Sequence, residues 1–375
     1  MKIITKLGVC ILFAGGIIFS SCKKKDFCQA CSNNPITGTS TNLQVKLIPI
    51  GKLSEPKSYF VAASAGNKIV FAGGWLENGY SQSADIYDIS TNTWSVAWLS
   101  EEYRQGMVAA SVGNKIFFAG GGNNDVGYVT SRIDIYDVVS NAWSIAELSE
   151  PKEYLAAATI GNKVFFAGGG NWNPAYTGLS TVDIYDNATN TWSKTNLSQG
   201  RSNLSAAAIG GKVYFAGGST DAYERGSNNI DIFDTLTNNW SGSSVQELKN
   251  FHASVAAGNK IYWAGGRYFK TNNIMTTSGQ IEIRDVNTGI SSFHSIYPRS
   301  EFSAVVKGDY IVFFTGRYGE GNYFDEYNFS TNTWLSGQLP KKINDATIIS
   351  VNNTIYVAGG YVDGVLSSQV WKLEF

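Results

Sequence analysis

Short apolar runs alternate with turn-forming residues throughout most of the chain. A run of small residues such as Val61–Ala63 is followed by the turn Gly66–Lys68, by the apolar run Ile69–Ala72 and then by a Gly-Gly pair. Runs of this length that are bounded by Gly, Asn and Ser are typical of β-strands joined by tight turns. The pattern therefore predicts pairs of adjacent strands.

The same order of elements recurs with a period of about 48 residues and gives seven units. After the glycines, each unit continues with a variable loop, a third strand such as Asp85–Asp88, a turn, and a fourth strand that opens at a Trp such as Trp94. The sixth unit has Thr315-Gly316 in place of the pair. The second glycine of the seven units falls at Gly74, Gly121, Gly169, Gly218, Gly266, Gly316 and Gly360.

The Trp follows an Asp or Asn by six residues in five units, whereas the fifth unit has Ser291 at the Trp position. This spacing resembles the Kelch repeat, which folds as one propeller blade per unit, and the resemblance covers residues 43–375. It implies an all-β fold, a seven-bladed Kelch-type β-propeller with four-stranded antiparallel blades. We interpret the Trp as interblade packing. The five pairs are Asp88 and Trp94, Asp137 and Trp143, Asp186 and Trp192, Asp234 and Trp240, and Asn328 and Trp334.

The last unit lacks a fourth strand, because the chain ends soon after Val370–Leu373. Upstream of the first unit, Leu43–Ile50 runs into Leu53–Pro56, as earlier fourth strands run into Leu148–Pro151. We therefore expect the N-terminal strand to complete the last blade and to remove an exposed sheet edge.

Composition and charge support a folded domain and exclude some functions. Of 375 residues, 43% are hydrophobic and 16% charged, with Lys plus Arg 29 against Asp plus Glu 30. A net charge near zero argues against nucleic-acid binding, and the high Gly count fits an all-β chain. Two His and four Cys leave few ligands for a metal, so no metal or other cofactor is expected.

Residues 1–21 have the pattern of a secretory signal peptide, with Lys2 and Lys6 ahead of the apolar stretch Leu7–Phe19. That stretch is shorter than the roughly 20 residues that a spanning helix needs. Ser20-Ser21-Cys22 resembles a bacterial lipobox, although Phe19 stands where Leu is usual. The resemblance implies lipidation of Cys22 and a cell-envelope protein anchored in a bacterial membrane, with the outer membrane as the expected location. The alternative is a plain signal peptide.

Residues 22–42 are expected to form the lipidated Cys and a flexible tether rich in Ser, Thr, Asn and Gly, and residues 43–375 the propeller. Cys28 and Cys31 form a C-x-x-C pair. A disulfide formed in an oxidising compartment is the favoured interpretation, against a redox pair or half a zinc site.

A basic residue precedes the first strand of six units, nine residues before the glycine of the following turn. Such a set predicts a basic ring at one mouth of the channel that would attract an anionic ligand such as a carboxylated sugar. The alternative is that a basic residue at this position is part of the repeat pattern itself and serves packing. The set comprises Lys57, Arg104, Lys152, Arg201, Lys249 and Arg299, with Ile343 in the seventh unit.

Two positions later the units differ, as expected where a binding site departs from a repeat. These residues are Tyr59, Gly106, Tyr154, Asn203, Phe251, Glu301 and Asp345. The loops after the glycines add aromatic residues, among them Trp75 and Trp172, and the two pairs Arg267-Tyr268 and Arg317-Tyr318. Aromatic faces beside amides and carboxylates suit sugars or a partner protein.

The sequence offers little for catalysis. His252 replaces apolar residues of other units and is interpreted as packed, whereas His294 lies in an expected outer strand. Copper-radical Kelch enzymes similar to galactose oxidase are excluded, because every Cys lies at or before Cys31.

The leading hypothesis is a non-catalytic, lipid-anchored module of the cell envelope that binds a glycan or a protein through the loop face and channel mouth. The alternative is a metal-independent sugar mutarotase or epimerase similar to sialic acid mutarotase. In that reading the candidate catalytic residues are Glu301, Asp345 and Arg299.

Overall fold

In the computed structural model, the regular secondary structure of the described residues consists of β-strands. These residues are 43–101, 104–123, 127–171, 176–221, 224–269, 275–316 and 322–375, all within the unit Ser40–Phe375. No helix occurs in these ranges, and so none there is long and apolar enough to cross a membrane. The all-β expectation is confirmed.

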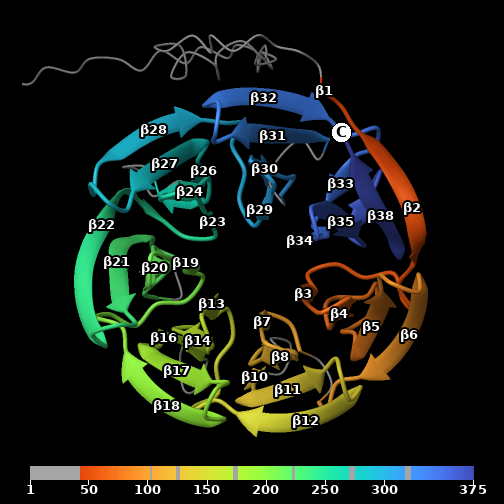
Figure 1. Ribbon diagram of the computed structural model, residues 1–375, viewed down its shortest axis with the longest axis horizontal. Helices are drawn as coiled ribbons and strands as arrows, with labels where there is room; N and C mark the ends of the chain where they lie inside the picture. The colour runs from red at the N-terminus through yellow and green to blue at the C-terminus, as the bar shows by residue number, and fades with distance from the viewer. Residues whose placement is uncertain are drawn as a thin grey trace, which may run out of the picture. The chain divides into compact units, whose positions relative to one another are not determined.

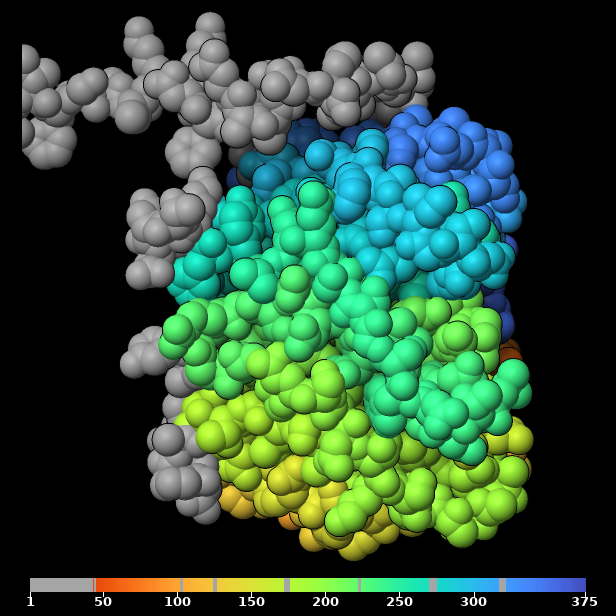
Figure 2. Space-filling model, turned by 90° about the vertical axis from the view of Figure 1, so that its left-hand side faces the viewer, coloured from red at the N-terminus to blue at the C-terminus, as the bar shows by residue number. Residues whose placement is uncertain are grey.

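The described residues contain seven large sheets, which lie around a common axis (Figure 1). Each has four antiparallel strands, and one of them gains a short fifth strand in parallel pairing. The side view shows successive units following one another in chain order, from yellow through green to blue (Figure 2). From the innermost strand outward, the sheets are β3 (Val61–Ala65), β4 (Lys68–Ala72), β5 (Ser83–Asp88), β6 (Thr93–Trp98); β7 (Val108–Val112), β8 (Lys115–Ala119), β11 (Arg132–Asp137), β12 (Ala142–Glu147); β13 (Ala156–Ile160), β14 (Lys163–Ala167), β17 (Thr181–Asp186), β18 (Thr191–Asn196); β19 (Ser205–Ile209), β20 (Lys212–Ala216), β21 (Ser227–Asp234), β22 (Asn239–Lys249); β23 (Ala253–Ala257), β24 (Lys260–Ala264), β27 (Gln280–Asp285), β28 (Ser291–Ser295); β29 (Ala304–Lys307), β30 (Tyr310–Phe313), β31 (Tyr323–Asn328), β32 (Thr333–Gln338); and β34 (Thr347–Val351), β35 (Thr354–Ala358), β38 (Gln369–Glu374), β2 (Lys46–Lys52).

The innermost strands contact one another around the axis, and β34 contacts β3. Small residues such as Ala62 and Ala109 recur in these strands because the sheets approach most closely there. The second strands carry the core, and Val70 and Phe71 of β4 are fully buried. Alternate side chains of one strand thus pack against the sheets on either side.

The N-terminal strand belongs to the sheet of the last unit. Strand β2 pairs antiparallel with β38, with Lys46 opposite Glu374 and Ile48 opposite Lys372. The short strand β1 (Leu43–Gln44) pairs parallel with β32 of the neighbouring sheet. The first ten described residues therefore connect the sheets of units six and seven.

Short strands occupy the loops on the face to which the Gly-Gly pairs lead. Isolated bridges hold loop residues against the segment that enters the innermost strand of the same unit, as Gly122 does opposite Gln105. These strands are β9 (Gly122–Asn123) with β10 (Tyr128–Val129), β15 (Gly170–Asn171) with β16 (Thr177–Gly178), β25 (Arg267–Phe269) with β26 (Met275–Thr277), and β33 (Ile343–Asn344) with β36 (Tyr361–Val362) and β37 (Val365–Leu366).

The Gly-Gly pair is required where the second strand ends. Gly120 and Gly121 have φ of +66° and +95°, which residues with a Cβ rarely adopt. A Cβ on Gly120 would lie 2.3 Å from the carbonyl oxygen of Lys152, and one on Gly121 would lie 2.6 Å from that of Gln105. Two backbone segments therefore approach the pair closely.

The recurring Trp side chains pack between neighbouring sheets, as the sequence suggests. Trp240 Nε1 donates a hydrogen bond to Thr195 Oγ1 of the preceding sheet at 3.0 Å. Trp334 stacks on His294 of the preceding sheet with ring centroids 3.8 Å apart. His294 is thus a packing residue in this structure.

Candidate functional site

The basic residues expected at the channel mouth are buried inside the sheets. Five of the six side chains have no exposed surface and Arg299 is 2% exposed, so they cannot form a basic ring that meets a ligand. That prediction is wrong, and the packing alternative describes them correctly. The six are Lys57, Arg104, Lys152, Arg201, Lys249 and Arg299.

Arg104 and Asp134 show how the repeat uses these charges. Arg104 pairs with Asp134 and also donates hydrogen bonds to the carbonyl oxygens of Gly120 at 3.0 Å and Phe118 at 2.8 Å. The second oxygen of Asp134 accepts the backbone N–H of Ser100 at 2.8 Å, in the crossing from the preceding sheet. We call this arrangement of a cation, a carboxylate and a crossing N–H the internal clamp.

The internal clamp recurs with variations. Burial lowers the pKa of Lys57, and the charge of Asp85 at 2.8 Å opposes that shift. Lys152 lies 2.8 Å from Asp183. Two further pairs are Arg201 with Asp231, and Arg299 with Asp325. In these pairs the charge balances inside the sheet, which leaves no cation for an external anion.

The fifth and seventh units depart from this pattern. Lys249 lies 3.7 Å from Glu247, while Glu282 accepts the crossing N–H of Gln246 at 2.7 Å. In the seventh unit Ile343 replaces the cation and Trp371 the carboxylate, and both belong to one apolar cluster. The last unit thus replaces an ion pair with apolar contact.

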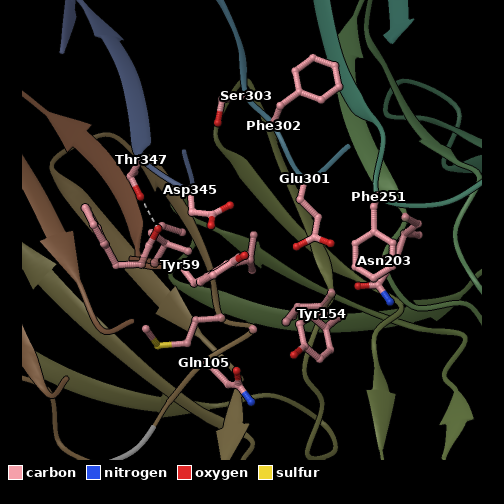
Figure 3. Close-up of a pocket in the computed structure, with 18 of the residues that line it drawn as sticks. Tyr59, Gln105, Tyr154, Asn203, Phe251, Glu301, Phe302, Ser303, Asp345 and Thr347 are labelled. Atoms are coloured by element: carbon pink, nitrogen blue, oxygen red, sulfur yellow. Dashed lines mark hydrogen bonds between the residues drawn. The ribbon is translucent and has the colours of Figure 1, made fainter. Parts of the chain in front are cut away.

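A cavity of about 760 Å³ lies beside the first turn of the innermost strands. This volume is in the range of about 300–1,000 Å³ that is common for ligand pockets. Figure 3 shows side chains from several sheets extending into it. Among its aromatic and polar lining residues are Tyr59, Trp75, Gln105, Tyr154, Tyr176, Asn203, Asp221, Glu224, Phe251, Arg267, Glu301 and Asp345.

Seven of the lining residues hold equivalent positions in the seven units, and we call them the collar. Each has φ between +52° and +63°, a conformation that Gly adopts freely, that Asn and Asp tolerate, and that most other residues adopt rarely. Strained backbone of this kind is concentrated at binding and catalytic sites. The collar consists of Tyr59, Gly106, Tyr154, Asn203, Phe251, Glu301 and Asp345.

Backbone hydrogen bonds join successive collar residues. The N–H of Tyr154 donates to the carbonyl of Gly106 at 2.8 Å, and that of Asn203 donates to Tyr154 at 2.9 Å. Phe251 donates to Asn203 at 3.2 Å and Glu301 to Phe251 at 3.0 Å. The backbone therefore fixes these positions without using their side chains.

One side of the cavity is aromatic. The rings of Tyr59 and Trp75 lie 5.0 Å apart, and Trp75 Nε1 donates a hydrogen bond to the Gln105 side chain. A Cβ on Gly106 would lie 3.1 Å from the Tyr154 ring, so the glycine leaves room for that ring. Flat apolar faces and amide groups thus border the same space.

The opposite side holds a cation that is surrounded by two carboxylates and an aromatic ring. Arg267 pairs with Glu224 at 3.2 Å and with Glu301, and its guanidinium lies 4.4 Å from the centroid of the Phe251 ring. Ser300 Oγ accepts a further hydrogen bond from Nε at 3.4 Å. Arg267 is only 8% exposed, so its charge interacts mainly with side chains of the cavity wall and little with the open space.

Among the described residues, most charged side chains of the lining are acidic. Asp221, Glu224, Glu301 and Asp345 line the cavity in this part of the chain, together with the guanidinium of Arg267. This balance is opposite to the basic mouth that the sequence suggested. The described residues contain no group of His, Cys, Asp and Glu that could hold a metal ion.

His252 lines the cavity but is packed rather than presented to it. Its Nε2 lies 2.7 Å from Ser205 Oγ, and its Nδ1 has no hydrogen-bond partner among the described residues. Burial lowers its pKa well below the usual 6.5, and the charges of Lys249 and Arg201 add to the shift.

This burial predicts a pH effect on stability. Below pH 6.5 the unfolded chain binds a proton at His252 that the folded chain excludes, so the free energy of unfolding falls as pH falls. We expect His252→Leu, which has the side chain of Leu155 and Leu204 at equivalent positions, to remove about 1 kcal/mol per pH unit of that loss. Urea unfolding at pH 7.5, 6.0 and 5.0 measures it. Parallel losses in both proteins would refute the prediction.

The sequence-predicted site residues divide into three groups. Tyr59, Trp75, Tyr154, Asn203, Arg267, Glu301 and Asp345 line the cavity. Tyr268 does not line it, and the six cations of the expected ring, Lys57, Arg104, Lys152, Arg201, Lys249 and Arg299, are buried elsewhere. Cys22, Trp172, Arg317 and Tyr318 lie outside the described residues.

Three of the charged and amide side chains in the lining were not predicted. Gln105 lies between a clamp cation and a collar residue, while Asp221 and Glu224 lie in a loop that follows Gly218. The position of Gln105 next to the collar is a usable signal. Because these loops vary in length, their residues have no fixed position in the repeat. The sequence therefore could not place the two carboxylates at the cavity.

Comparison with known proteins agrees with the repeat. Residues 106–277 match a family described as KLHDC2/KLHL20/DRC7 Kelch-repeats domain, and residues 56–97 match the Kelch motif. The solved structure of YjhT is similar with a TM-score of 0.54 at 13% identity, over 86% of this chain and 95% of that one. No curated protein gives a significant match. The chain is therefore a Kelch-repeat protein with a propeller fold.

Proposed function

We propose that each of the seven large sheets is one blade and that β2 closes the last blade. The pairing of β2 with β38 and the contact of β34 with β3 support this reading. We further propose that residues 1–21 are a signal peptide and that Cys22 carries lipid. The propeller of residues 43–375 would then stand on the tether 22–42 in a bacterial cell envelope.

Within that setting, the protein is a non-catalytic module that binds a saccharide in the cavity. The observation that carries this proposal is the lining: ring faces of Tyr59, Trp75 and Tyr154 border the same space as amide and carboxylate groups. Aromatic faces stack on the C–H faces of sugars, and amides and carboxylates take their hydroxyl groups. A protein partner is the competing outcome.

The test is a glycan array probed with the chain from Leu43 onward, followed by titration of the best hit. Trp75→Ala should weaken binding by about tenfold or more, because it removes a half-buried aromatic face of the cavity. Trp98→Ala is the matched control, since Trp98 is 63% exposed and lies outside the cavity lining. An array without hits, or equal losses in both variants, would refute saccharide binding in this cavity.

A sugar mutarotase is the second candidate. It is favoured by two carboxylates, Glu301 and Asp345, on the wall of one cavity. Arg299 drops out of this candidate site because it is buried and paired with Asp325. Exchange between anomers, followed by NMR on the sugar that binds, distinguishes catalysis from binding alone.

A further inference from the structure

We propose that the saccharide bound in the cavity carries an aliphatic chain, and that this chain lies along the propeller axis beyond the collar. This inference rests on the proposed function, because it names the ligand class of the same cavity, a saccharide amphiphile. Three observations support it: an apolar ring next to the collar, a space that continues from the cavity along the axis, and the small apolar side chains around that space.

The residues that directly follow the collar form a second ring, which we call the floor ring. All seven line the cavity, and six of them are apolar. The seventh is His252, and because burial lowers its pKa well below the usual 6.5, it is uncharged at neutral pH. The cavity thus changes from mixed polar and aromatic side chains at the collar to apolar ones at the floor ring. The floor ring consists of Phe60, Met107, Leu155, Leu204, His252, Phe302 and Ala346.

A second space of about 320 Å³ adjoins the floor ring, and we call it the axial channel. The innermost strands of six sheets line it, namely β7, β13, β19, β23, β29 and β34. Six residues line both the cavity and the axial channel, and five of them are apolar. These six are Val108, Leu155, Leu204, Phe302, Ile348 and Ser303. Because the two spaces share these residues, a chain attached to a sugar in the cavity reaches the axial channel over apolar side chains.

The wall of the axial channel suits an aliphatic chain. Ser254 Oγ donates a hydrogen bond to the carbonyl of Ala206 at 2.8 Å, and Ser205 Oγ lies 2.7 Å from His252 Nε2. These two hydroxyls are therefore engaged within the protein. Small side chains leave the axial channel its width, and moving methylene groups from water to apolar surroundings is favourable. The remaining lining residues are Ala156, Ala157, Ala253, Ala304 and Val305.

The experiment titrates the chain from Leu43 onward with the methyl, butyl, hexyl and octyl β-glycosides of the sugar found on the array. For a glucose-ended hit these are the alkyl β-D-glucopyranosides, each used below its critical micelle concentration. We expect the affinity to rise about three- to fourfold for each methylene group that enters the axial channel, and to level off once the axial channel is filled. An affinity that does not change with chain length would overturn this inference alone. An array without any hits would overturn the proposed function itself.

Ala157→Ile tests where the chain lies. Ala157 lines the axial channel but not the cavity. The seventh unit has Ile348 at the equivalent position, three residues after its collar residue, so the repeat accommodates the larger side chain. The added carbons narrow the axial channel. We therefore expect the affinity for the octyl glycoside to fall by about tenfold, and that for the methyl glycoside to stay unchanged.

Ala188→Ile is the matched control. Ala188 lies in an exposed turn outside both linings, and Val139 and Leu236 stand at equivalent positions in other units. Both affinities should persist in this variant. The same gain with chain length in Ala157→Ile as in the unchanged protein would place the aliphatic chain outside the axial channel and overturn the inference. Should Ala157→Ile fail to fold, seen as loss of methyl glycoside binding, the chain-length series in the unchanged protein decides.

Discussion

Asp134→Ala should lower the free energy of unfolding by about 3–5 kcal/mol, because it leaves a buried guanidinium without its counter-charge. Arg104 has no exposed surface, and the substitution also removes the acceptor of the Ser100 N–H. Water cannot replace the carboxylate without opening the contact between neighbouring sheets. Urea unfolding followed by Trp fluorescence measures the loss.

Two further variants separate charge from packing. In an exposed turn, the Asp137 carboxylate accepts the backbone N–H groups of Val139 and Ser140. Asp137→Ala should therefore lower the free energy of unfolding by about 1 kcal/mol or less. Arg104→Ile combined with Asp134→Trp copies the Ile343 and Trp371 of the seventh unit, and should cost less than Asp134→Ala alone. A loss below about 1 kcal/mol for Asp134→Ala would contradict the role of the internal clamp.

A chain that begins at Leu53 should be far less stable than one that begins at Leu43. Without β2, the edge of β38 loses its hydrogen-bond partners and the side chains beneath it are exposed. We expect a loss of more than about 5 kcal/mol and association of the exposed edges. Thermal unfolding and size-exclusion chromatography measure both effects.

A chain that begins at Lys46 is the control for this truncation. It lacks β1 and Val45, a residue that is 7% exposed, but retains β2. Its stability should fall by about 1–3 kcal/mol, as expected for one buried apolar side chain and two terminal residues. A monomeric Leu53 chain with the same unfolding temperature as the Leu43 chain would show that β2 is dispensable.

The strands were predictable because every unit repeats the same apolar runs and turns. The burial of the cations was not predicted, although the sequence contains a signal for it. A carboxylate follows each of Lys57, Arg104, Lys152, Arg201 and Arg299 by 26 to 31 residues, at Asp85, Asp134, Asp183, Asp231 and Asp325. The seventh unit lacks both partners at once, as expected if the two positions depend on each other.

The collar was predictable as a position but not as a chemical environment. Its irregular residues marked where the repeat departs from itself, and this marks the cavity correctly. Two of the lining carboxylates, Asp221 and Glu224, lie in a loop whose length and residues differ from those of the loops in other units. Only the folded chain shows that Glu224 and Glu301 meet at Arg267.

Five successive collar residues, Gly106, Tyr154, Asn203, Phe251 and Glu301, are joined to one another through backbone N–H and carbonyl groups. The scaffold therefore places few demands on what their side chains are, as the range from Gly106 to Tyr154 illustrates. Under the proposed function, recognition and stability are encoded at separate sites in each repeat. Substituting the seven collar codons in combination should yield a library of receptors on an unchanged framework, with Gly, Asn and Asp as the least strained starting choices.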